Sequence, residues 1–157
     1  MQDPLRRAFE AHHARLVRLG VLLLGTSEGA EDLAQDAFVK AAMRIETFAP
    51  DEVGPYLRQV LVNLWKNRLR RLAVERRFRA RMSRSDPGPA DAVEEGDVLW
   101  RAVARLPNRQ RACLVLRYYE DLPERAVAEI MGCSVGTVKS QTSRSLDKLR
   151  KELGHGD

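Results

Sequence analysis

Residues 123–150 read PERAVAEIMGCSVGTVKSQTSRSLDKLR and predict two helices joined by a short turn. The first helix has apolar residues at helical spacing up to Met131, and Gly132 is a residue that commonly ends helices. Ser134 is a favoured N-cap for the second helix, in which Val135 and Val138 are expected to face inward. Two helices joined by a turn of about three residues have the geometry of a helix-turn-helix.

The opposite side of the second predicted helix combines short hydroxyls with cations, and its members are Thr137, Lys139, Ser140, Ser143 and Arg144. Hydroxyls and lysine can bond the edges of bases, and arginine can bond guanine or phosphate, so this face suits the major groove of DNA. The alternative is the solvated face of an ordinary helix pair. The turn length, the N-cap and the polar face agree with one another and favour DNA binding.

Helical periodicity extends through the rest of the chain. Apolar positions from Leu5 to Leu23 recur at steps of four and three, which is one face of a helix. A second helix is predicted over 30–45, and a third begins at Tyr56 and continues through a basic stretch, with residues 50–55 as a turn between them. Residues 99–106 predict a short helix. No segment alternates with a period of two, so the predicted fold class is all-α.

Residues 83–97 read SRSDPGPADAVEEGD and differ in composition from both flanks. They contain two prolines, two glycines and almost no large apolar side chain, so they cannot bury enough surface to offset their chain entropy. Residues 85–97 carry five acidic side chains and no basic one. We therefore expect two small helical domains, residues 1–82 and 98–157, joined by a flexible acidic linker over residues 83–97.

The overall composition excludes several classes of protein. The chain has 157 residues and a net charge of +5, which favours a polyanionic partner over a deep cofactor site in a large enzyme. No apolar run approaches the about 20 residues that a membrane span needs, so no membrane span and no signal peptide are expected, and the predicted location is the cytoplasm. Cys113 and Cys133 are isolated, and no histidine has a ligand-spaced neighbour, so we expect buried thiols and no metal or cofactor.

Two further charged clusters lie in the first half of the chain. Residues 58–84 contain ten basic side chains and one acid, with Tyr56, Trp65 and Phe78 in or beside the cluster. Basic residues interleaved with aromatic ones suit unpaired nucleic acid, although a solvated basic helix end with a core tryptophan is a strong alternative. The predicted second helix carries an acidic patch, which is either surface charge matched to the helix dipole or a docking face for a basic protein. Its members are Glu31, Asp32, Gln35 and Asp36.

Three stretches together resemble bacterial RNA polymerase sigma factors of the extracytoplasmic-function (ECF) group. AEDLAQDAFVKA at 30–41 is similar to the polymerase-docking helix of that family, and PYLRQVLVNLWKNRLRR at 55–71 is similar to its minus-ten element reader. Residues 106–150, with the typical run VGTVKS at 135–140, resemble its minus-thirty-five reader. The resemblance covers nearly the whole chain. It implies an initiation factor that binds core RNA polymerase and promoter DNA, commonly under an anti-sigma factor.

The resemblance also implies roles for the matched positions. The residues expected to meet the clamp coiled coil of the polymerase are Asp32, Gln35 and Asp36. The turn from Phe48 to Val53 would hold an extruded base, and the residues along the opened minus-ten DNA would be Asn63, Lys66, Asn67 and Arg68. The contacts to the minus-thirty-five duplex would come from Arg117, Thr137, Lys139, Ser140, Ser143 and Arg144.

The chain departs from many relatives at several positions. Ala41 and Ala42 replace a common aromatic residue, Tyr56 replaces tryptophan, and Gln141 replaces arginine. The promoter sequence is therefore not transferable from the family.

Two other classes of function compete with the sigma factor. A polymerase-independent helix-turn-helix regulator usually needs a dimer interface, and no long heptad repeat is present. A DNA enzyme such as a serine recombinase needs an N-terminal α/β catalytic domain, whereas the first serine here is Ser27 and no strand is predicted before it. We therefore expect no catalytic residue in this chain.

Overall fold

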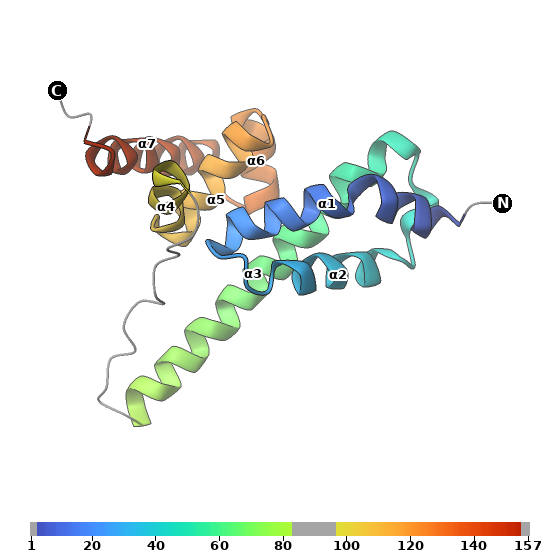
Figure 1. The fold of residues 1–157 in the computed structure, drawn as a ribbon, viewed down its shortest axis with the longest axis horizontal. Helices are drawn as coiled ribbons and strands as arrows, with labels where there is room; N and C mark the ends of the chain where they lie inside the picture. Colours follow the sequence, from blue (N-terminus) through green and yellow to red (C-terminus); the bar gives the residue numbers. More distant parts are fainter. Residues whose placement is uncertain (1–2, 83–96, 155–157) are drawn as a thin grey trace. The chain divides into compact units, whose positions relative to one another are not determined.

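The computed structural model describes residues 3–82 and 97–154, and these residues form helices with no strand among them. The first part contains α1 (Pro4–Leu24), α2 (Ala30–Ala41), the short 3₁₀ helix η1 (Ile45–Thr47) and α3 (Pro50–Met82). The second part contains α4 (Val98–Ala104), α5 (Asn108–Leu114), the π-helical η2 (Val115–Tyr119), α6 (Glu124–Met131) and α7 (Val135–Glu152) (Figure 1). The all-α prediction is confirmed.

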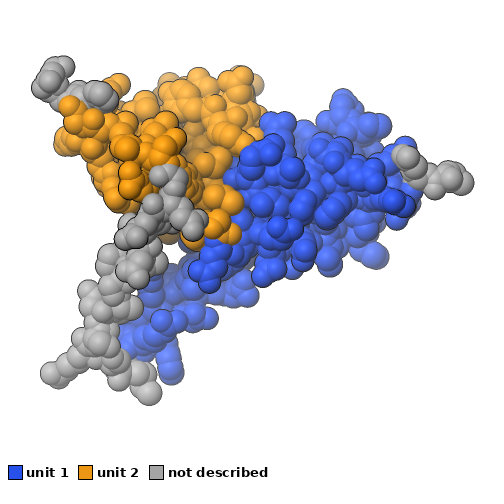
Figure 2. All heavy atoms as spheres, in the orientation of Figure 1, with its two compact units in different colours: residues 1–20, 28–91 blue, residues 21–27, 92–157 orange. Residues whose placement is uncertain are grey.

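The chain divides into two compact units (Figure 2). Unit 1 comprises residues 1–20 and 28–91, and unit 2 comprises residues 21–27 and 92–157, so the end of α1 groups with the second unit. The predicted linker, residues 83–97, lies outside the described residues except for Asp97, which caps α4 by accepting a hydrogen bond from the backbone N–H of Trp100. None of the described helices combines the length and apolar character needed to cross a bilayer.

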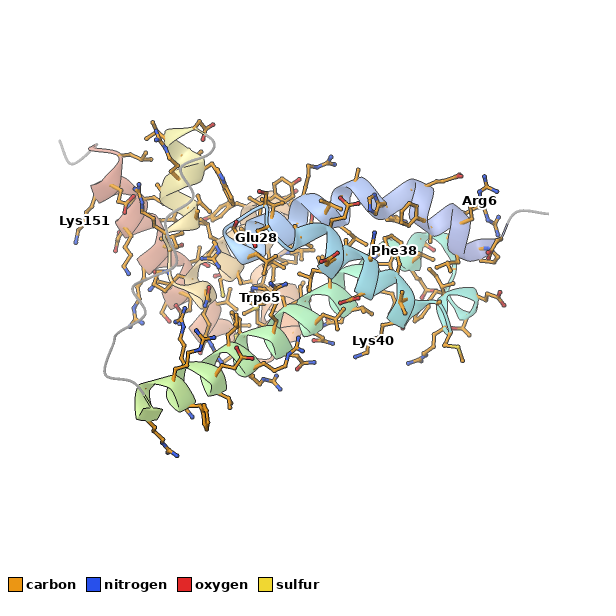
Figure 3. All side chains as sticks on the ribbon, turned by 60° about the horizontal axis from the view of Figure 1, so that its bottom comes forward. Arg6, Glu28, Phe38, Lys40, Trp65 and Lys151 are labelled. Carbon is orange, nitrogen blue, oxygen red and sulfur yellow. The ribbon has the colours of Figure 1, made fainter. Side chains whose placement is uncertain are left out.

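The core of unit 1 is made by one face of each of its three long helices. Leu19 of α1, Phe38 of α2 and Leu61 of α3 are all buried. Trp65 of α3 is only 1% exposed, so this tryptophan is a core residue and not a platform for stacking bases (Figure 3). Gly20 allows α1 to approach α2 closely, because a Cβ at this position would lie 3.4 Å from the carbonyl oxygen of Ala30.

The start of α3 differs from the predicted turn over residues 50–55, and that prediction was wrong. α3 begins at Pro50, a residue type well suited to the first helical position. The backbone N–H of Ala49 donates to Oε1 of Glu52 at 2.8 Å, and the N–H of Glu52 donates to the carbonyl of Ala49 at the same distance. Such reciprocal bonds stabilise a helix start. Pro55 has no backbone N–H to donate to the helix. This loss is tolerated because Pro55 is exposed and lies near the start of α3.

Unit 2 contains the predicted helix-turn-helix. α6 ends at Gly132, whose φ of 71° is in the left-handed region that glycine accepts without strain. The hydroxyl of Ser134 then accepts the backbone N–H of Thr137 at 3.0 Å and caps α7. Val138 is fully buried as predicted, but Val135 is 38% exposed. Val135 is the first residue of α7 and lies at the rim of the packed surface, so the inward prediction was wrong for this residue.

Arg111 is a buried cation that links the segments of unit 2. It is 3% exposed, and burial lowers the pKa of its guanidinium to about 10. The guanidinium donates to the carbonyls of Leu23 and Leu106, at 2.7 Å each, and to Oδ1 of Asn108 at 2.7 Å. These hydrogen bonds satisfy a charge that would otherwise make burial costly. Cys113 is buried, as predicted, and burial raises the pKa of its thiol to about 11. Cys133 is only half-buried, because it lies in the turn between α6 and α7, so the prediction of a buried thiol was wrong there.

Candidate nucleic-acid interface

The exposed face of α7 carries most of the predicted minus-thirty-five residues. Lys139, Ser143 and Arg144 are exposed, and none of the three has a protein partner within the described residues. Because Val138 and Leu149 bury the other side of the helix, these groups point away from the core of unit 2. Two cations and a hydroxyl on one face form a surface that can contact bases and phosphates.

The other two predicted residues of α7 are partly engaged by the protein. The hydroxyl of Thr137 lies 2.9 Å from the hydroxyl of Ser134, so this half-buried side chain belongs to the helix cap. The hydroxyl of Ser140 donates to the carbonyl of Gly136 at 3.0 Å. The Ser140 oxygen remains exposed as an acceptor, whereas its proton is used within the helix.

Arg117 lies apart from α7, on the π-helical η2. Its guanidinium donates to the carbonyl of Leu122 at 3.2 Å and lies 5.3 Å from the centre of the Tyr118 ring. The side chain is half-buried. These contacts fix the guanidinium at the segment that leads into α6, the first helix of the helix-turn-helix. The structure therefore gives Arg117 a position set by its neighbours in unit 2.

The predicted minus-ten residues of α3 divide into two groups. Asn63 and Asn67 are exposed one turn apart, and the amide of Gln59 donates to Oδ1 of Asn63 at 3.1 Å. Lys66 is half-buried beside them. Arg68 is on another side of α3, where a Cβ at Gly29 would lie 3.0 Å from its guanidinium nitrogens. The structure thus groups Asn63, Lys66 and Asn67, and directs Arg68 toward the start of α2.

A cavity of about 680 Å³ opens beside Phe48 in unit 1. This volume is within the range of about 300–1,000 Å³ that is typical of ligand pockets. The Phe48 ring stacks on Tyr56 with ring centres 4.2 Å apart, which fixes the wall of the cavity. The predicted turn from Phe48 to Val53 supplies only part of the lining, which consists of Pro4, Arg7, Ala8, Ala11, His12, Ile45, Glu46, Phe48, Pro50 and Val53.

His12 brings an imidazole from α1 into this cavity. Its ring packs against the first turns of α3, where a Cβ at Gly54 would lie 3.1 Å from the imidazole Cε1. Burial, and secondarily the charge of Arg15, lower the pKa of His12. A neutral imidazole is therefore favoured at neutral pH, and it can both donate and accept a hydrogen bond.

The lowered pKa of His12 makes the stability of unit 1 depend on pH. The unfolded chain binds a proton at His12 more readily than the folded chain does, so stability falls as the pH drops below the ordinary histidine pKa of about 6.5. We predict that a His12→Gln variant loses less stability than the wild type between about pH 7.5 and about pH 5.5. Urea denaturation at the two pH values measures this difference. Arg15→Gln should fall between the two chains, and identical losses in the wild type and His12→Gln would contradict the prediction.

The predicted docking residues share one exposed face of α2. Asp32, Gln35 and Asp36 are all exposed there. The sequence analysis missed two large exposed apolar side chains, Val39 on the same face of α2 and Met43 in the turn after α2, which are 73% and 90% exposed. Val39 lies three residues after Asp36, and this helical spacing could have indicated it. The face therefore combines negative charge with large exposed apolar groups, a combination that suits a protein partner better than DNA.

Comparisons with known proteins identify the family of the chain. Residues 8–75 match the model of the Sigma-70 region 2 family, and residues 96–149 match that of Sigma-70, region 4. The chain is 32% identical to the ECF RNA polymerase sigma factor SigM of Mycobacterium tuberculosis over 94% of this chain and 76% of the relative. It is 27% identical to the ECF sigma factor SigW of Bacillus subtilis, over 97% of this chain and 90% of the relative.

A solved structure has the same fold. The sigma factor RpoE of Bartonella quintana, crystallised with the anti-sigma factor NepR, matches with a TM-score of 0.74 and 22% identity, over 97% of this chain and 98% of that one. The region 2 match precedes the region 4 match, and the predicted site residues of α2, α3 and α7 lie within the two matches. The chain belongs to the ECF group of RNA polymerase sigma factors.

Proposed function

We propose that this ECF sigma factor directs core RNA polymerase to its promoters by dividing the work between its two units. Unit 1 holds the polymerase and the opened minus-ten element, and unit 2 binds the minus-thirty-five duplex. The observation that carries this proposal is the pair Lys139 and Arg144 on a helix capped by Ser134. Both side chains are exposed and have no protein partner in the part of the chain that the structure describes, which suits major-groove binding. Catalysis is left to the polymerase.

The α2 face is the proposed polymerase contact. Asp32, Gln35 and Asp36 can pair with basic and polar groups of the clamp coiled coil, while Val39 and Met43 add apolar area that is exposed in the free chain. Complementary charge speeds and orients docking, and buried apolar area supplies affinity. Acidic side chains would repel DNA, which supports a protein partner at this face.

The α3 face and the adjacent cavity are the proposed minus-ten site. Asn63, Lys66 and Asn67 can follow the opened strand, and an extruded base can enter the cavity beside Phe48 and His12. Taking a base out of the stack costs a few kcal/mol, which contacts in a shaped cavity can offset. Arg68 is proposed to reach phosphates from the neighbouring side of α3.

The α7 face is the proposed minus-thirty-five reader. In this proposal, Lys139, Ser140 and Ser143 contact the edges of bases, and Arg144 contacts guanine or a phosphate. Thr137 and Arg117, near the ends of the two helices, make contacts that position the protein on the DNA. We also propose control by an anti-sigma factor, because the structural relative RpoE was crystallised with one. We propose a cytoplasmic location, because the proposed partners, core polymerase and promoter DNA, are found there.

Transcription by core polymerase on a genomic DNA library, with and without this chain, tests the proposed function. We predict that the chain creates a set of start sites that share two upstream sequence elements. Asn63→Ala/Asn67→Ala should reduce transcripts from those sites by roughly tenfold or more, since two base- or backbone-contacting amides are lost. An unchanged set of start sites would contradict the proposal. Tight, specific binding of the chain alone to the same sites would favour the polymerase-independent regulator instead.

A further inference from the structure

The cavity in unit 1 has two walls of different origin. One wall comes from the predicted turn over residues 48–53 and is lined there by apolar side chains. The other wall comes from the N-terminal half of α1, which the sequence analysis did not connect with the minus-ten element. Its lining residues are Pro4, Arg7, Ala8, Ala11 and His12. The α1 wall therefore adds polar groups that the predicted turn does not supply.

His12 is the polar lining residue that the protein encloses most. It is half-buried, whereas Arg7 and Glu46 are exposed, so water competes for the charges of those two residues. Within the described residues, neither imidazole nitrogen of His12 has a hydrogen-bond partner. The neighbouring His13 differs, because its Nε2 lies 3.3 Å from Oε1 of Glu31. His12 thus presents unused hydrogen-bonding groups to the cavity.

The imidazole of His12 is held in place by the close approach of α3. A Cβ at Gly54 would lie 3.1 Å from its Cε1 and 3.5 Å from its Nδ1, so the ring fits where glycine leaves room. The Phe48 ring, which is stacked on Tyr56, lines the same cavity. One ring that can stack and one that can bond an edge are complementary groups for a planar nucleobase.

The neutral imidazole carries one donor and one acceptor. Burial and the charge of Arg15 lower the pKa of His12 and favour this form. The four bases present donors and acceptors in different orders along their edges. A half-buried group with one of each therefore pairs with some bases and is left unpaired by others. Sites of this kind discriminate strongly, because an enclosed polar group without a partner is costly.

We propose that His12 is a specificity-determining residue of the minus-ten site, whose imidazole bonds the edge of the extruded base and thereby selects that base. This proposal rests on the proposed function, which places the extruded base in this cavity. Stacking on Phe48 holds the base but tolerates all four bases, because each of them has a π-face. The choice among bases therefore falls to the hydrogen bonds that the α1 wall supplies.

Variants at two neighbouring histidines test the role of His12. His12→Leu removes the hydrogen-bonding groups, and His12→Gln keeps both a donor and an acceptor. His13→Leu is the matched control, because His13 is on the same helix but does not line the cavity. Each variant is assembled with core polymerase and titrated with fluorescent single strands that carry the minus-ten element. Each position of the element holds, in turn, one of the four bases or an abasic site.

The measured quantity is the ratio of the binding constants for the best and the worst base at each position. We expect His12→Leu to lower this ratio at least about fivefold at one position, and at no other. When that position is abasic, His12→Leu and the wild type should bind alike. His12→Gln should keep part of the ratio, and His13→Leu should match the wild type. An unchanged ratio in His12→Leu, or an equal fall at every position, would overturn the proposal.

Gly54→Ala tests the same role while the imidazole is retained. The added Cβ pushes the ring of His12 from its place, whereas alanine is a good helix former. The ratio should fall at the position that His12→Leu identifies, and a fall at another position or at none would overturn the proposal. Circular dichroism and co-elution with core polymerase show that each variant is folded, and Gly54→Ala decides the question if His12→Leu is not.

The same titration separates this proposal from the proposed function. If Asn63→Ala/Asn67→Ala weakens binding while His12→Leu and Gly54→Ala leave every ratio unchanged, only the role of His12 is wrong. If the wild-type holoenzyme binds all of the strands alike, the placement of the minus-ten element on unit 1 is wrong, and the role of His12 fails with it.

Discussion

An Asp36→Arg variant is expected to lose at least about 100-fold in affinity for core RNA polymerase, or about 2.8 kcal/mol. Asp36 is exposed in the middle of the α2 face, between Asp32 and Val39. The substitution removes one attractive charge and places a cation opposite a basic partner, and like charges at an interface cost several kcal/mol. No buried group of unit 1 is altered, so the helices should remain intact.

Glu10→Arg is the matched control for this prediction. Glu10 is an exposed acid on α1 with a surface ion pair to Arg6 at 3.3 Å, so its reversal changes the net charge equally and costs little stability. Surface plasmon resonance with immobilised core polymerase measures both variants, and circular dichroism confirms that they are helical. Retained affinity in Asp36→Arg, or an equal loss in Glu10→Arg, would remove the docking role of the α2 face.

An Arg144→Ala variant is expected to weaken promoter binding by the holoenzyme by about 1–3 kcal/mol, a fall of roughly 5- to 150-fold. Arg144 is exposed on the α7 face, beside Ser143 and one turn after Ser140, with no protein partner within the described residues. A lost bidentate contact to guanine would relax the sequence preference at one position, whereas a lost phosphate contact would weaken all sequences alike.

Arg150→Ala is the matched control on the same helix. Arg150 lies in the last turn of α7, far from the capped end, and pairs with Asp147 at 3.5 Å. The Arg150→Ala substitution removes the same charge from the same helix as Arg144→Ala does. Electrophoretic mobility-shift titration of both variants therefore separates a site-specific contact from general electrostatics. Wild-type affinity in Arg144→Ala, for both the cognate and a scrambled minus-thirty-five element, would contradict the assignment.

Local signals predicted the helix-turn-helix well. Gly132 and Ser134 act through their own backbone conformation and one nearby hydrogen bond, so their roles are readable from neighbouring residues. The start of α3 also had local signals, Pro50 at the first position and Glu52 two residues later, but the second proline made the segment resemble a turn. That error came from weighing proline as a helix breaker without considering its position in the helix.

Features made by distant segments could not be predicted in this way. The cavity beside Phe48 depends on His12 and Arg7 of α1, which no local pattern connects to residues 45–53. The direction of Arg68 depends on Gly29, which is far from it in the sequence. The burial of Arg111 depends on carbonyls of separate segments, including that of Leu23. In each case the deciding contact is tertiary, and composition and periodicity carry no information about it.

The dependence of specific DNA binding on core polymerase tests the central claim most directly. The measurement is the affinity of the purified chain for a promoter fragment and for a scrambled fragment, each with and without core polymerase. We predict weak, strongly salt-dependent binding with no preference for the chain alone, and tight promoter-specific binding once the polymerase is present. Tight and specific binding by the chain alone, or no gain in specificity when core polymerase is added, would contradict a function as a promoter-specificity subunit.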